Sequence, residues 1–264
     1  MPLLLLLTHS TLPIELTDYS IALLGGALAG FINTLAGNGS AITLPIMTEV
    51  LGLPAQVANG SNRIGVLAQC TTSSWAFYQG GKLEFPLALW VTLPVFGGAM
   101  LGLYLAIIAS NEQFYEVYRV LMLLMLVVIL IKPKRWLREY TESEHRSVLW
   151  LSPLLFVLGV YGGFIQMGMG LFFLMVMVLL GRYSLTVSNG MKLFVVGCYT
   201  AVVLAIFAWR DLVDWQVGGV IAIAQMVSGY LTARFAIQSD RANLWIHRLL
   251  VVVVIAAVVR MFVA

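Results

Sequence analysis

The sequence predicts an all-α integral membrane protein made of two inverted repeats, each a broken, re-entrant helix pair followed by three transmembrane helices. Three observations lead to this fold class. Hydrophobic residues make up 61% of the 264 residues and charged residues 10%, with a mean hydropathy of +0.95. The first apolar element of each half is interrupted by glycines, and the two halves resemble each other weakly. A soluble domain could not cover so much apolar surface.

Apolar runs of roughly 17 to 25 residues fill most of the chain, and each can cross about 30 Å of hydrocarbon as a helix. In the first half we expect a broken element at 19–36 and 40–51, then spans near 55–78, 85–108 and 113–131. In the second half we expect a broken element at 149–167 and 170–181, then spans near 185–208, 215–236 and 243–263. The domains are therefore a first transmembrane repeat (1–131), a cytoplasmic basic loop (132–147) and a second transmembrane repeat (148–264).

The internal repeat is visible in residues as well as in hydropathy. The segment Gly30-Phe31-Ile32-Asn33 resembles Gly163-Phe164-Ile165-Gln166, and Asn59-Gly60 resembles Asn189-Gly190. With a gap of one residue, Arg63 then pairs with Lys192. These matches predict two halves of the same architecture.

The breaks Gly37–Ser40 and Gly168–Gly170 release the helix and favour a hairpin. If each broken element turns back, every half crosses three times and the two halves are inverted. The residues then placed inside are basic: Lys82, Lys132, Lys134, Arg135, Arg138, Arg146, Arg182, Arg234, Arg241 and Arg248. This distribution satisfies the positive-inside rule and predicts a multi-pass protein of the cytoplasmic (inner) membrane.

Two cations, Arg63 and Lys192, lie eight or nine residues inside apolar segments. A charge near the bilayer centre costs about 2.5–3.5 kcal/mol, so each needs a partner or a water-filled cavity. Every Asp, Glu and His lies at the end of a span or in a loop. The charge pattern therefore favours a negative substrate. The alternative is structural: both cations snorkel to an interface or bind backbone carbonyls at broken helix ends.

Polar residues around the breaks could line a cavity with these cations, although any single Asn or Ser could equally serve helix packing or capping. Half-helices that begin at the breaks would also direct their N-terminal amides towards an oxyanion. The predicted substrate-binding residues are Arg63, Lys192, Asn33, Asn38, Ser40, Asn59, Ser61, Asn62, Gln166 and Asn189.

Other functional classes find little support in the sequence. It has no metalloprotease, nucleophile-elbow or phosphate-loop motif and no intramembrane pair of carboxylates, so we expect neither an enzyme nor a catalytic residue. We also expect no cofactor and no metal site, because the methionine cluster lacks supporting Cys or His. The basic residues gather in short loops, which excludes nucleic acid as a partner.

Short motifs in a fixed order extend over nearly the full chain: Gly30-Phe31, Gly37-Asn38-Gly39, Leu44-Pro45, Gly52-Leu53-Pro54, Ala58-Asn59-Gly60-Ser61-Asn62-Arg63, Gly80-Gly81-Lys82-Leu83-Glu84-Phe85 and Gly97–Gly102. In these motifs the chain resembles the sulfite exporter TauE/SafE family of membrane permeases. The resemblance implies transport of sulfite, sulfonates or related small anions across the cytoplasmic membrane, commonly outward. The sequence departs from the family pattern at Asn38-Gly39-Ser40 and at the methionine-rich segment Gln166–Gly170.

The resulting hypothesis is a secondary transporter that exports a small sulfur oxyanion, sulfite or an organosulfonate, by alternating access around a midplane site between Arg63 and Lys192. The alternatives are a carrier of another small organic or inorganic anion, an anion channel, or a membrane scaffold. The expected partners are the anionic substrate and the lipid bilayer. A homodimer is also plausible from small residues that could equally pack within one chain: Gly97, Gly98, Gly102, Gly218 and Gly219.

Overall fold

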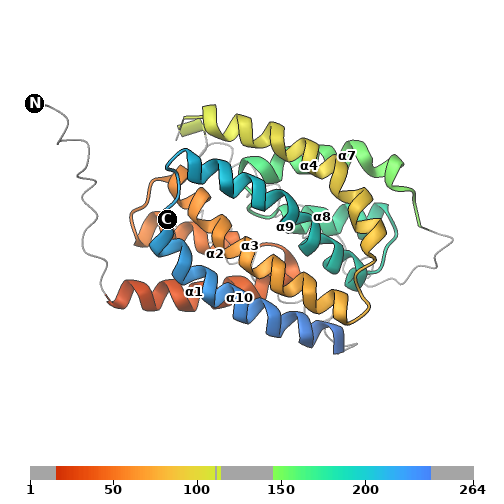
Figure 1. Cartoon of the computed structure of the whole chain (residues 1–264), viewed down its shortest axis with the longest axis horizontal. Coiled ribbons are helices and arrows are strands. Elements are labelled where there is room, and N and C mark those ends of the chain that lie inside the picture. Colours follow the sequence, from red (N-terminus) through yellow and green to blue (C-terminus); the bar gives the residue numbers. More distant parts are fainter. Residues whose placement is uncertain (1–15, 111, 114–144, 239–264) are drawn as a thin grey trace, which may run out of the picture.

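The computed structural model describes residues 16–110, 112–113 and 145–238, and all regular elements in this part of the chain are helical (Figure 1). The first half contains α1 (Leu16–Ala36), α2 (Ser40–Pro45), the π-helix η1 (Ile46–Val50), α3 (Ala55–Gln79) and α4 (Phe85–Ile108). The second half contains α7 (Val148–Phe164), α8 (Met169–Leu174), the π-helix η3 (Met175–Leu180), α9 (Leu185–Trp209) and α10 (Trp215–Gln238). The predicted spans 113–131 and 243–263 and most of the loop 132–147 lie outside the described residues.

Four of the described helices are long and apolar enough to cross a membrane: Asp18–Ala36 within α1, and α4, α9 and α10. The prediction of an all-α membrane protein is therefore confirmed. Helix α3 has 25 residues but is more polar, because it carries a buried set of amide, hydroxyl and guanidinium groups. It lies between α9 and α10, so protein surrounds its polar face (Figure 1).

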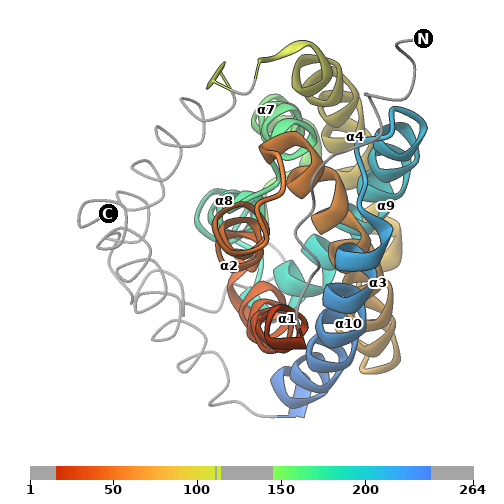
Figure 2. The same ribbon diagram turned by 90° about the vertical axis from the view of Figure 1, so that its left-hand side faces the viewer.

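The first element of each half is interrupted where the glycines predict, and the chain folds back at each break. A Cβ atom added to Gly39 would lie only 2.4 Å from the Ala29 carbonyl oxygen, which shows how closely the two segments approach. Helix α2 therefore returns along α1. In the second half the Arg146 amide donates to the Gly181 carbonyl oxygen at 3.0 Å, which brings the end of η3 back to the start of α7. Figure 2 shows α2 close to α1.

The two halves share one backbone register. Helices α3 and α9 each have 25 residues, and α4 and α10 each have 24. Three left-handed positions recur as well: Gly37, Gly52 and Gly81 in the first half correspond to Gln166, Arg182 and Asp211 in the second. The repeat is therefore a repeat of backbone conformation, even where the residue type has changed.

This register corrects two residue pairings that the sequence suggested. Since α3 and α9 match from end to end without a gap, Arg63 corresponds to Leu193 and not to Lys192. A one-residue gap inside a helix would rotate every later side chain by about 100°. Because Gly37 and Gln166 are the equivalent left-handed residues, Gln166 does not correspond to Asn33 either.

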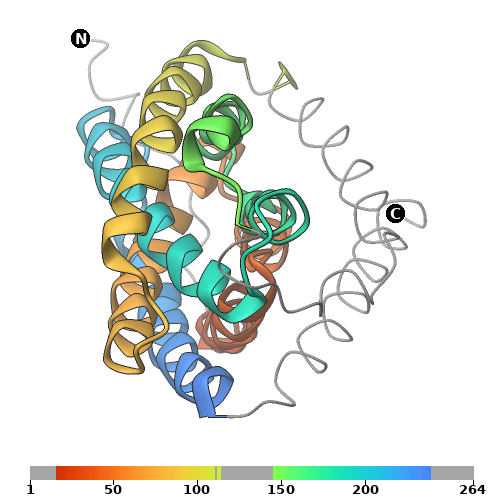
Figure 3. The same ribbon diagram turned by 90° about the vertical axis from the view of Figure 1, so that its right-hand side faces the viewer.

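Helices α3 and α9 run antiparallel, with the start of each beside the end of the other. A Cβ on Gly60 would lie 2.0 Å from the Leu212 carbonyl oxygen, and one on Gly190 would lie 2.7 Å from that of Lys82. Each outer helix likewise packs on the broken helix of the other half: α4 packs on α7, and α10 packs on α1 (Figure 3, yellow on green and blue on red). The orientation of the two halves in a membrane stays a prediction.

Charge is sorted between the two ends of the described bundle. The turn after α3 lies beside the start of α9 and of α7, and these turns carry a basic set: Lys82, Arg146 and Arg182. The start of α3 lies beside the turn between α9 and α10, where the Asp214 amide donates to Ser61 Oγ at 2.7 Å. That turn also contains Asp211 and one cation, Arg210, so the charged groups of this turn are mainly acidic. The sorting agrees with the inside and outside faces proposed from the sequence.

Several glycines considered for a dimer interface pack inside the chain. A Cβ on Gly98 would lie 2.0 Å from the Phe156 carbonyl oxygen, and one on Gly102 would lie 1.9 Å from that of Val160. These glycines let α4 and α7 approach closely, as small residues do between membrane helices. A Cβ on Gly219 would meet no atom within 4 Å. The homodimer stays a prediction, and Gly98 and Gly102 no longer support it.

We expect Gly98→Ala to destabilise the protein by about 1–3 kcal/mol, because the new methyl group overlaps the backbone of α7. The matched control is Gly219→Ala on α10, which we expect to be neutral or slightly stabilising. Thermal unfolding in detergent measures both changes. Equal melting temperatures for the two variants would contradict the close α4–α7 packing.

Candidate functional site

Arg63 is fully buried on α3 and binds the end of the broken helix α7 in the other half. Its Nη2 donates to the Gly163 carbonyl oxygen at 2.8 Å, and both terminal nitrogens lie 3.4 Å from that of Gly162. Its Nη1 also donates to Gln166 Oε1 at 3.4 Å. The guanidinium carbon lies 5.3 Å from the centre of the Phe207 ring. Arg63 therefore joins the two repeats through backbone oxygens.

Lys192 on α9 makes the reciprocal contact with the end of α1. Its Nζ donates to the carbonyl oxygens of Asn33 at 2.9 Å and Thr34 at 3.1 Å, and to Asn189 Oδ1 at 2.8 Å. Its side chain is buried, with 2% of its surface exposed. Each repeat therefore supplies a cation that binds the last turn of the broken helix in the other repeat.

Helix ends explain why cations occupy these places. The last carbonyl oxygens of an α-helix have no partner within the helix and carry partial negative charge. Inside hydrocarbon they must find donors from the protein. In this conformation Arg63 and Lys192 supply those donors, which is the structural alternative considered for both residues.

The Arg63 guanidinium lies beside a different turn of α9 from the one that carries Lys192. Gln166 accepts from Arg63 and donates through Nε2 to Thr200 Oγ1 at 2.9 Å, so the guanidinium lies near Thr200. Thr200 follows Lys192 by eight residues, about 12 Å along α9. The placement of a small anion between both cations stays a prediction.

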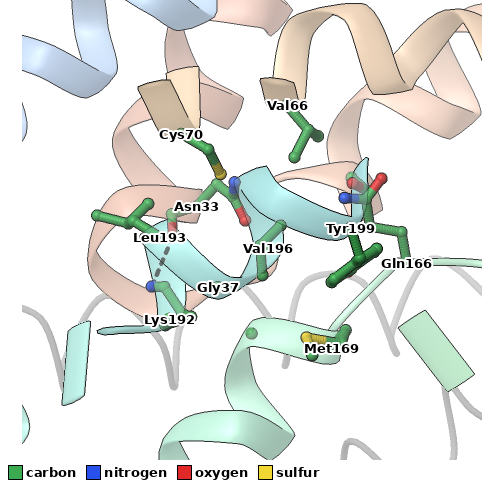
Figure 4. Close-up of a pocket in the computed structure, with 12 residues that line it drawn as sticks. Asn33, Gly37, Val66, Cys70, Gln166, Met169, Lys192, Leu193, Val196 and Tyr199 are labelled. Atoms are coloured by element: carbon green, nitrogen blue, oxygen red, sulfur yellow. Dashed lines mark hydrogen bonds between the residues drawn. The ribbon is translucent and has the colours of Figure 1, made fainter. Parts of the chain in front are cut away.

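A cavity of about 10 Å³ lies between the two breaks (Figure 4). It has room for about one water molecule. Lys192 and Asn33 stand at one end of it and Gln166 and Tyr199 at the other, with Val196 between them (Figure 4). An oxyanion would need the cavity to widen.

The predicted site residues fall into two groups. Those that line the cavity are Asn33, Ser40, Gln166 and Lys192. Asn38 is buried, and its side-chain amide has no hydrogen-bond partner among the described residues. The others bind the surrounding helices: Asn59, Ser61, Asn62, Arg63 and Asn189. Within the second group, Asn62 binds Ser40 Oγ at 2.9 Å and Ser61 binds the α9–α10 turn, so both hold helices together.

Sequence reasoning missed Tyr199, which lines the cavity and is fully buried. The available signal was its position on α9 seven residues after Lys192, because residues i and i+7 share one helix face. Gln69 on α3 binds the end of α1: it accepts from Asn33 Nδ2 and donates to Thr34 Oγ1 and the Gly30 carbonyl oxygen.

Broken helices that meet around buried cations within a bundle of membrane-spanning helices define a multi-pass membrane transporter. The chain belongs to the sulfite exporter TauE/SafE family, whose model matches residues 22–261.

Curated relatives are named as membrane transporters. The chain is 25% identical over 240 residues to a probable membrane transporter protein, ORF9, of Sinorhizobium sp, with 89% of this chain and 88% of that protein covered. It is 23% identical to a probable membrane transporter protein of Xylella fastidiosa strain 9a5c, covering 89% of this chain and 91% of the relative. A probable membrane transporter protein of Haemophilus influenzae is 24% identical, covering 82% and 84% of the two chains. No solved structure matches the chain.

We expect Lys192→Met to lower the stability of the folded protein by about 1–3 kcal/mol, because it removes the donor of the Thr34 carbonyl oxygen and leaves the Asn33 carbonyl oxygen with the Gly37 amide as its remaining donor. The control is Arg210→Met, which removes an exposed cation in the α9–α10 turn. Thermal unfolding in detergent compares the two. A Lys192→Met protein as stable as the control would show that the capping bonds contribute nothing.

Proposed function

We propose that this protein is a secondary transporter of small sulfur oxyanions, sulfite or an organosulfonate, that exports them across the cytoplasmic membrane by alternating access. The observation that carries the proposal is a pair of buried cations, each bound to the end of a broken helix in the opposite repeat. The described carboxylates lie near helix ends or in turns, so they leave the positive charge of Lys192 and Arg63 available to an anion. No enzymatic role is proposed.

In the proposed mechanism, oxygen atoms of the substrate replace backbone carbonyl oxygens as the acceptors at the buried cations. An anion that enters the widened cavity replaces the Asn33 and Thr34 carbonyl oxygens at Lys192, since an ionised acceptor binds an ammonium more strongly than a neutral carbonyl does. Release of the α1 end then frees one repeat to move against the other. At the opposite end of the cavity, Arg63 and the end of α7 act as the equivalent pair.

Arg63 has one further feature that suits an anion. Its Nε is buried and has no acceptor among the described residues. Buried donors are normally bonded, so this one is free to bind a substrate oxygen when the cavity widens.

The small cavity favours a carrier over a channel. A carrier passes through a closed intermediate, whereas a channel conducts without one. The space beside Lys192 holds about one water molecule, which supports the closed state of a carrier.

The test is uptake of radiolabelled sulfite into proteoliposomes that contain the pure protein, with sulfate, taurine and chloride as competitors. We expect saturable uptake in the wild type and its loss in Arg63→Ala. Lys192→Gln is the sharper variant, because a neutral amide still donates to the carbonyl oxygens but carries no charge. We expect it to lose about tenfold or more in uptake, while Lys192→Arg retains activity with a changed KM.

Arg210→Ala serves as the control, because it removes an exposed cation from the α9–α10 turn. A Lys192→Gln protein that transports normally would make Lys192 a structural cap and overturn its role in binding. The absence of any anion uptake by the folded wild type would overturn the proposed function and favour the scaffold alternative.

A further inference from the structure

Helix α9 directs three different kinds of side chain into the cavity. Lys192, Val196 and Tyr199 are separated by four and then three residues, which places them on one face of the helix. Lys192 and Tyr199 are therefore about 10 Å apart along the axis, one at each end of the cavity (Figure 4). The wall between them is apolar, formed by Val66 of α3 and by Val196.

The Tyr199 hydroxyl group is a buried polar group without a partner. The side chain is 0% exposed, and among the described residues the oxygen makes no hydrogen bond of normal geometry, although the polar side chains of Gln166 and Thr200 lie within weak interaction range of it. It lies close to Gln166 and Thr200, but these two side chains bond each other. Buried tyrosine hydroxyls usually have a partner, so this one is available to a ligand.

The equivalent residue in the first half has hydrogen-bond partners. By the register of α3 and α9, Tyr199 corresponds to Gln69, which is bonded to Asn33, Thr34 and the Gly30 carbonyl oxygen. At this pair of equivalent positions, the Gln69 amide is bonded and the Tyr199 hydroxyl is not.

We propose that the Tyr199 hydroxyl is a specificity-determining group that binds an oxygen of the substrate remote from its acid group. The acid group lies at Lys192 with Asn33 and Ser40, and a short hydrocarbon body lies along Val66 and Val196. The inference rests on the proposed function, because it places the anionic end of the transported molecule at Lys192. A hydroxylated organic anion uses both ends of the cavity, whereas an inorganic oxyanion uses one.

The cavity must expand to admit such a molecule, and its walls contain side chains that can move. Met169 and Lys192 both line it, and both have long, unbranched and flexible side chains. Gly170 and Gly37 form the contact between the two breaks, where a Cβ on Gly170 would lie 2.5 Å from the Gly37 Cα. Separation of these two glycines would lengthen the space between the breaks.

The test compares two sulfonates that differ by one hydroxyl group, isethionate (hydroxyethanesulfonate) and ethanesulfonate. Binding of each to the purified protein in nanodiscs is measured by calorimetry for the wild type and for Tyr199→Phe. We expect the wild type to bind isethionate about 3- to 10-fold more tightly than ethanesulfonate, and Tyr199→Phe to lose that preference while its affinity for ethanesulfonate is unchanged. Tyr183→Phe is the matched control, because its hydroxyl donates to the Arg146 carbonyl oxygen away from the cavity.

The outcomes separate the two proposals. An equal preference for isethionate in the wild type and Tyr199→Phe, or no preference in either, overturns the role of Tyr199 and leaves anion transport intact. A wild type that binds neither sulfonate and transports no anion overturns both proposals. Thermal unfolding gives an independent readout: since the hydroxyl has no partner in the empty protein, Tyr199→Phe should be as stable as the wild type or more so. A large loss of stability would make Tyr199 structural, for instance by binding one buried water.

Discussion

The need of the carbonyl oxygens at the ends of two interrupted helices for donors is the constraint on which this structure depends. In hydrocarbon these oxygens cannot turn to water, so the protein has to supply donors. It does so with Arg63 for the end of α7 and with Lys192 for the end of α1. Because each donor belongs to the other repeat, the same bonds that satisfy the helix ends also hold the two halves together.

The two halves share a backbone but line the cavity differently. Left-handed residues recur at equivalent turns, with Gly81 in one half and Asp211 in the other, and the long helices match in length. At the cavity, however, Gln69 is fully engaged by the end of α1 while Tyr199 is not bonded. In the proposed carrier, this asymmetric lining lets the cavity select one orientation of its substrate.

The sequence predicted the helices, the breaks and the buried cations, since hydropathy, glycine pairs and isolated charges are strong local signals. It offered backbone carbonyls at broken helix ends only as an alternative for Arg63, because backbone oxygens of a distant helix leave no trace in residue type. It also mispaired Arg63 with Lys192, because matching charges suggested a gap that helix geometry does not allow. Tyr199 was missed for a further reason: without its neighbours, a tyrosine in an apolar helix cannot be distinguished from core packing.

The cross-repeat bonds also bear on how the chain assembles during synthesis. Thr34 and Lys192 are 158 residues apart, so the first broken helix is made long before its donor exists. Until α9 has entered the membrane, the end of α1 has to remain near water or be held by the insertion machinery. The second repeat meets the opposite situation, because Arg63 is already in place when α7 arrives. Insertion of the first hairpin is therefore completed late, at the time when α9 joins the bundle.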